Sequence, residues 1–126
     1  MNRLIRFTII MAATLLTAAS LHAEPDQVTQ TIFKTLMEAT VSNNYDAFIA
    51  ECDAPMKAAM TKPILEGASK QIEPRAKQGY EAQYFGEVKK QGYQVHIWRL
   101  QFKDGGDDIV ATLSVKDGKA GGFFLK

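Results

Sequence analysis

The chain has 126 residues, of which 46% are hydrophobic, 10% aromatic and 23% charged, and its formal net charge is +1. These values are typical of one globular domain and leave no length for a second. They exclude a disordered tail, a collagen-like fibre and a membrane protein with several spans. Because the charge is nearly balanced, a dedicated nucleic-acid-binding protein is disfavoured, and we expect no nucleic-acid partner.

Residues 1–23 have the pattern of a secretory signal peptide: two arginines, an apolar run, and a smaller, more polar segment that ends at Ala23. We expect cleavage after Ala23, or alternatively after Ser20. Residues 24–126 would then form one exported domain in the periplasm or outside the cell. The apolar run is shorter than the roughly 20 residues that span a bilayer, so we expect no stable membrane anchor.

Apolar residues recur at three- and four-residue spacing through the first half of the mature chain, which predicts amphipathic helices. An asparagine between the first two helices suits the N-cap of the second. The predicted ranges are 25–41, 45–52, a short segment 53–60, and a third stretch from Thr61 to Pro74 or Gly79.

Beyond Gly79 the pattern changes to alternation, which is typical of strands. The predicted strands are 81–89, 93–103, 107–116 and 119–125. Each connecting turn contains glycine, as a tight hairpin requires. The sequence therefore predicts an α+β fold, in which N-terminal helices pack on one face of a curved four-stranded antiparallel meander.

The alternation also assigns side chains to the faces of the sheet. Three sets are each predicted to share a face: Ala82, Tyr84, Gly86 and Val88; His96, Trp98, Leu100 and Phe102; and Ile109, Ala111, Leu113 and Val115. Cys52 falls on the apolar stripe of its helix. The single cysteine is therefore expected to be buried, with a redox or nucleophilic role as the less favoured alternative.

Two stretches resemble a known superfamily. Residues 39–48 form a helix end, a polar break and Tyr-Asp-Ala-Phe, and residues 115–124 form a strand, an Asp-Gly-Lys turn and a final strand of Gly and Phe. Together with the helices-then-meander order, they resemble small exported members of the nuclear transport factor two-like superfamily, also called the cystatin-like or cone fold. The resemblance implies a cone-shaped half-barrel, a pocket on its concave face, and homodimers formed through the outer face of the sheet. Many such members have no established activity.

The resemblance supplies no catalytic residue. In its ketosteroid isomerase branch, pocket acids and a tyrosine do the chemistry, and that pattern does not match this sequence. After processing, His96 is the single histidine and Cys52 the single cysteine, which excludes a His-rich or Cys-rich metal site. The acidic segment 104–108 lacks the spacing of a calcium-binding loop and is interpreted as a solvated turn. Phosphate-cradling loops and serine-hydrolase elbows are also missing, so we expect no cofactor.

The candidate pocket residues lie on the predicted strands, where side chains can line the mouth of a pocket. They are Tyr84, His96, Trp98, Leu113 and Phe124. The competing interpretation is that the aromatic residues simply fill the core of a small domain. A further alternative places 123–125 in a dimer interface.

Two functions from different classes follow. The favoured one is an exported, non-enzymatic domain that binds a small apolar molecule or another protein, as a homodimer. The alternative is a small isomerase or dehydratase, in which His96 acts as general base and Asp108 on the next strand orients it. A third, less favoured reading retains residues 1–23 as the tether of a secretion assembly.

Overall fold

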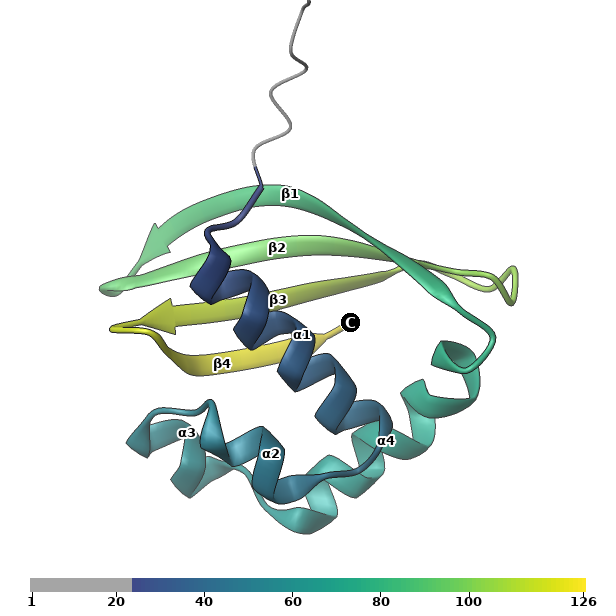
Figure 1. The fold of residues 1–126 in the computed structure, drawn as a ribbon, viewed down its shortest axis with the longest axis horizontal. Coiled ribbons are helices and arrows are strands. Elements are labelled where there is room, and N and C mark those ends of the chain that lie inside the picture. The colour runs from purple at the N-terminus through teal and green to yellow at the C-terminus, as the bar shows by residue number, and fades with distance from the viewer. Residues whose placement is uncertain (1–23) are drawn as a thin grey trace, which may run out of the picture.

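A computed structural model describes residues 24–126, and the predicted signal peptide lies outside them. Four helices come first and four strands follow, so the predicted α+β class is confirmed (Figure 1). The stretch after Asp53, for which only a short segment at 53–60 was expected, forms a separate helix. The elements are α1 (Gln27–Val41), α2 (Tyr45–Ala50), α3 (Ala54–Ala59), α4 (Lys62–Ala76), β1 (Tyr80–Lys90), β2 (Tyr93–Phe102), β3 (Ile109–Lys116) and β4 (Lys119–Leu125). Within 24–126, no helix is both long and apolar enough to cross a membrane.

Each helix begins at a polar side chain that accepts a hydrogen bond from the backbone of the first turn. The N-caps are Asp26, Asn44, Asp53 and Thr61. Such caps satisfy N–H groups that have no partner within the helix, which fixes where each helix starts. Four capped starts within 36 residues explain why this half of the chain folds as short segments rather than one long helix.

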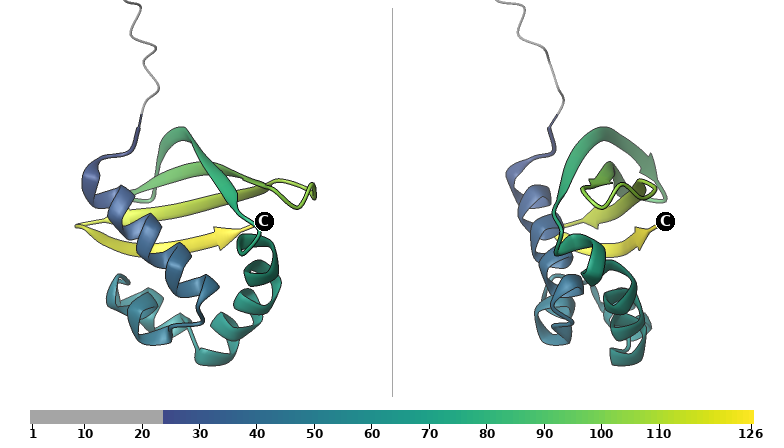
Figure 2. Two further views of the ribbon diagram at one scale, coloured as in Figure 1. Left: turned by 45° about the vertical axis from the view of Figure 1, so that its right-hand side comes forward. Right: turned by 90° about the vertical axis from the view of Figure 1, so that its right-hand side faces the viewer.

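The four strands form one antiparallel sheet in the order β1-β2-β3-β4. The strands bend together, α1 crosses one face of the sheet, and the other three helices lie beyond β4 (Figures 1 and 2). Buried and less buried residues alternate along β2 and β3, as expected for a sheet with one covered face. The predicted inward faces of these two strands are therefore confirmed.

The predicted face of β1 is wrong beyond Tyr84. Tyr84 lies opposite Trp98, but Gly86 lies opposite Ile97, so Phe85 is an extra residue in a β-bulge. Gly86 has a φ of 139°, which L side chains rarely adopt. The bulge reverses the alternation: Val88 lies on the outer face, away from Tyr84, and is 52% exposed.

The inner face of the sheet is filled by an aromatic contact with α1. The rings of Phe33 and Trp98 stack with centroids 4.0 Å apart and an interplanar angle of 11°. Phe123 meets the edge of Phe33 at 6.2 Å. Leu100 and Leu113 are fully buried around them. Because these side chains occupy the concave face, open cavities are found at the margins of the sheet.

The link between α2 and α3 is fixed to the outer edge of β4. Cys52 forms a parallel bridge with Ala120, and the Asp53 N–H donates to the Ala120 carbonyl at 2.8 Å. The hydroxyl of Tyr93, the first residue of β2, donates to the Asp53 carboxylate at 3.0 Å. The ring of Tyr93 lies directly over Gly121, where a Cβ atom would overlap it.

We predict that Gly121→Ala destabilises the domain by about 1–3 kcal/mol, because the added methyl group displaces Tyr93 from Asp53. Urea unfolding followed by the fluorescence of Trp98, the single tryptophan, measures the change. Gly67→Ala is the matched control: Gly67 lies inside α4 with no atom within 4 Å of an added Cβ. That change should stabilise the domain by about 0.5–1 kcal/mol. Equal effects of the two substitutions would contradict the Tyr93 contact.

Candidate functional site

The five residues predicted to line one pocket are distributed over three places. Tyr84 and Trp98 border a hollow between the start of α1 and β1. Phe124 borders a second cavity beside β4. His96 and Leu113 are buried and line neither of them.

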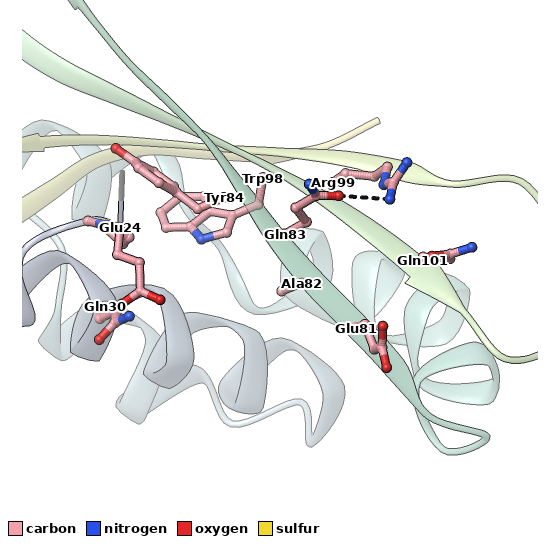
Figure 3. A pocket seen from close by; sticks show the side chains of 10 residues that line it. Glu24, Gln30, Glu81, Ala82, Gln83, Tyr84, Trp98, Arg99 and Gln101 are labelled. Carbon is pink, nitrogen blue, oxygen red and sulfur yellow. Dashed lines mark hydrogen bonds between the residues drawn. The ribbon is translucent and has the colours of Figure 1, made fainter. Parts of the chain in front are cut away.

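The first hollow, here the α1–β1 pocket, is mixed in polarity and has a volume of about 430 Å³. Its lining residues are Glu24, Pro25, Gln30, Glu81, Ala82, Gln83, Tyr84, Trp98, Arg99 and Gln101 (Figure 3). The Arg99 guanidinium is already engaged by the Gln83 side chain at 2.7 Å. Trp98 is only 3% exposed because its ring is stacked on α1. The α1–β1 pocket therefore offers a ligand little aromatic surface.

His96 lies below this pocket, in contact with Tyr84. The Tyr84 hydroxyl lies 2.8 Å from His96 Nδ1, and the Glu87 carboxylate lies 3.6 Å from His96 Nε2. Burial lowers the pKa of His96, and the carboxylates of Glu87 and Asp26 oppose that effect. A neutral ring carrying its proton on Nε2 suits both neighbours, because the Tyr84 hydroxyl then donates to Nδ1. Burial likewise raises the pKa of Tyr84.

The expected partner of His96, Asp108, is not beside it. Across the β2–β3 pair His96 lies opposite Leu113, while Asp108 lies 3.9 Å from the Nε of Arg99. Glu87 lies opposite His96 instead, because the bulge before it turns its side chain to the inner face. The glycine inside the sequence Tyr-Phe-Gly-Glu is the signal that could have indicated this bulge.

The second cavity, here the β4 pocket, is almost entirely apolar and has a volume of about 330 Å³. It lies between α3, α4 and the end of β4. Its lining residues are Thr40, Phe48, Met56, Ala59, Met60, Ile64, Leu65, Ala68, Phe123, Phe124 and Leu125. Thr40 is the one polar side chain among them, and its hydroxyl donates to the Leu36 carbonyl at 2.7 Å.

Helical spacing explains the floor and the rim of the β4 pocket. Met56 and Ala59 lie at i and i+3 in α3, so they face the same side, and Met60 follows as the C-cap, with its N–H bonded to the Met56 carbonyl. Ile64 from α4 and Phe124 from β4 are 53% and 58% exposed, so they leave apolar surface open to solvent. Only Phe124 was predicted as a pocket residue, although the spacing of the two methionines is visible in the sequence.

The predicted burial of Cys52 is confirmed. Its side chain is 1% exposed, and Sγ lies 3.3 Å from the Phe48 carbonyl. Burial raises the pKa of the thiol to about 11, and the carboxylates of Asp53 and Glu51 add to this effect. A thiol of this kind is a weak nucleophile at neutral pH, because little of it is ionised.

The acidic turn after β2 is occupied by an arginine. Arg75 Nε lies 2.7 Å from the Asp104 carboxylate, and its guanidinium donates to the Asp107 carbonyl at 2.6 Å. The same guanidinium lies over the ring of Phe102 at 4.1 Å. Among residues 24–126, no three histidine, cysteine or acidic side chains are grouped as metal ligands. The turn therefore attaches the end of α4 to the sheet.

We predict that the burial of His96 makes the domain less stable at mildly acidic pH. The pKa of His96 lies below its ordinary value of 6.5 in the folded state. As the pH falls through 6.5, the unfolded chain binds a proton that the folded one does not, and stability decreases. Urea unfolding between about pH 7 and pH 5 should show a smaller decrease for His96→Gln than for the natural protein. Parallel curves for the two proteins would refute the assignment to His96.

Comparison with known proteins identifies no relative from which a function could be inferred. A scan against protein-family models found no model that matches the chain, and a search among curated proteins found no match. The likeness to the nuclear transport factor two-like superfamily thus stays an expectation from two sequence stretches. The geometry of the β4 pocket is the stronger basis for a function.

Proposed function

We propose that this protein is an exported, non-catalytic binding domain that takes an apolar group of a ligand in the β4 pocket and acts as a homodimer. One observation carries the proposal: a cavity of about 330 Å³, open to solvent, whose lining is nearly all hydrocarbon and thioether. The exported location rests on the signal-peptide pattern of residues 1–23.

Apolar contact is the interaction that this pocket provides. Full burial of a side chain the size of leucine or methionine contributes about 1.5–3 kcal/mol, so a ligand group of that size gains useful affinity. Met56 and Met60 are unbranched and adaptable, which suits ligands of different shapes. Because Thr40 is bonded to its own helix, the pocket has no free polar side chain with which to recognise a polar group.

The outer face of the sheet supports the homodimer. Val88 is 52% exposed there and lies opposite Val95, and Ile97 follows Val95 on the same face of β2, whereas Val110, 44% exposed, lies opposite Arg99. Adjacent exposed apolar residues on one surface favour association with another protein surface. The expected superfamily resemblance implies the same face.

The catalytic alternative has less support. His96 is on the inner face, as a pocket base would need, but its side chain is only 3% exposed. Tyr84 and Glu87 face its two ring nitrogens, which leaves no position for a substrate atom beside it. An isomerase or dehydratase also needs a cavity that reaches the base, and the α1–β1 pocket does not include His96.

We predict that the apolar fluorophore N-phenylnaphthylamine binds to the β4 pocket with an increase in its fluorescence. Ala59→Glu should weaken binding at least about tenfold, because it places a charge against apolar surface. Ala58→Glu is the matched control: Ala58 is the preceding exposed residue of α3 and does not line the pocket.

The control separates a pocket effect from a change in helix stability. Both substitutions put the same side chain into the same helix, so they share any effect of charge or helix propensity. A fluorophore that does not bind the natural protein, or that binds both variants equally, would overturn the proposed site.

We also predict that the purified domain sediments as a dimer. Val88→Lys should shift it to the monomer, because a buried lysine would lose its hydration at the interface. Sedimentation velocity measures both masses, and circular dichroism verifies that the variant is folded. A natural protein that is monomeric at all accessible concentrations would remove the homodimer from the proposal.

A further inference from the structure

We infer that the ligand of the β4 pocket is an extended polypeptide segment, which adds as a strand to the free edge of β4 and inserts an apolar side chain into the cavity. The segment expected to bind best is apolar and flanked by acidic residues. This inference rests on the proposed binding role of the pocket and specifies its ligand.

The hydrogen-bond pattern identifies the free backbone groups of β4. Val110 and Lys126 exchange two backbone hydrogen bonds, at 2.7 and 3.0 Å. Bonded and non-bonded pairs alternate along an antiparallel ladder, so Phe124 bonds to β3 whereas Phe123 and Leu125 do not. The N–H and C=O groups of Phe123 and Leu125 therefore point away from the sheet, and no partner for them exists within residues 24–126.

These free groups border the β4 pocket. Phe123, Phe124 and Leu125 all line it, so unpaired backbone donors and acceptors lie next to apolar surface. A small apolar molecule would fill the cavity but would shield these groups from water without bonding to them, which is costly. A peptide strand satisfies both the cavity and the unpaired backbone groups, since its backbone bonds to the edge while alternate side chains enter the cavity.

The chain itself already adds a short extended segment to this edge. Ala120 accepts a hydrogen bond from the Asp53 N–H and donates one to the Glu51 carbonyl, both at 2.8 Å. Beyond Asp53 the chain turns into α3 and leaves the edge. The free positions at Phe123 and Leu125 thus continue an edge that accepts extended backbone at Ala120.

Charge at the rim points to acidic flanks. Lys126 Nζ lies 5.8 Å from the ring centroid of Phe124, and Lys57 follows Met56 in α3. Neither lysine forms an ion pair with any residue that the structure describes. The Lys126 ammonium beside the exposed Phe124 of an uncharged cavity is complementary to a segment with an apolar centre and a carboxylate at its end.

The other edge of the sheet lacks this combination. β1 carries a bulge at Phe85 and ends in Lys89 and Lys90, features that discourage strand addition. Among residues 24–126, only the start of α1 borders β1, and the hollow there is mixed in polarity rather than apolar. Strand addition is therefore assigned to β4 alone.

The test uses a fluorescein-labelled heptapeptide in which leucine and valine alternate with threonine, with glutamate at each end. Fluorescence anisotropy measures its affinity for the mature protein. Leu125→Pro removes the outward N–H without removing a bond to β3, and Leu125→Ala removes the side chain but keeps the N–H. We expect Leu125→Pro to bind the peptide at least about tenfold more weakly than Leu125→Ala does, whereas N-phenylnaphthylamine binds both variants equally.

A modified peptide keeps the test decisive if Leu125→Pro does not fold. N-methylation of the backbone on the edge-facing side should abolish binding to the natural protein, and methylation on the opposite side should not affect binding.

Peptide affinity that is equal for both variants, or that does not change with N-methylation, overturns the inference. Binding of N-phenylnaphthylamine without binding of the peptide overturns the inference but leaves the proposed function standing. If neither binds, both fail. If Leu125→Pro turns a dimer into a monomer and no peptide binds, the edge serves a second copy, and the inference is again overturned.

Discussion

The stacking of Phe33 on Trp98 determines where this molecule has room for anything else. A four-stranded sheet with one apolar face must bury that face, and here the 15-residue helix α1 crosses it, with Phe48 of α2 against Phe123 and Arg75 of α4 over Phe102. With two large rings 4.0 Å apart at the centre of the concave side, no volume is left there for a ligand. The α1–β1 pocket and the β4 pocket therefore lie at the margins of the sheet, where α1 no longer covers it.

The two margins differ because of what lies beside them. Within residues 24–126, the start of α1 borders β1, and the α1–β1 pocket is mixed in polarity. Beside β4 there are α3 and α4, which are attached at two points: Asp53 to the edge strand, and Arg75 to the turn after β2. Between these attachments the helices stand off from the end of β4, and the apolar side chains of both remain partly uncovered.

Periodicity in the sequence was sufficient for the order of elements and for the inward faces of β2 and β3. It failed at Phe85, because a bulge adds one residue and every later side chain of β1 changes face. The same error explains why Glu87 was not expected beside His96, whereas Asp108 was expected there from a β2–β3 register that the structure does not have, since His96 lies opposite Leu113. The β4 pocket could not be predicted from spacing alone, since it depends on how far α3 and α4 lie from a strand 60 residues later in the chain.

Cys52 has a consequence for the fate of the unfolded protein. With a single cysteine in the sequence, the domain holds its shape without any cross-link, and the folded state keeps its sulfur both inaccessible and protonated. Unfolding removes both protections at once. Under oxidising conditions two unfolded chains can then form an intermolecular disulfide through Cys52. A chain held in this disulfide cannot return to the monomeric folding equilibrium. Reversibility of unfolding thus depends on the redox condition of the solution, although the stability of the native fold does not.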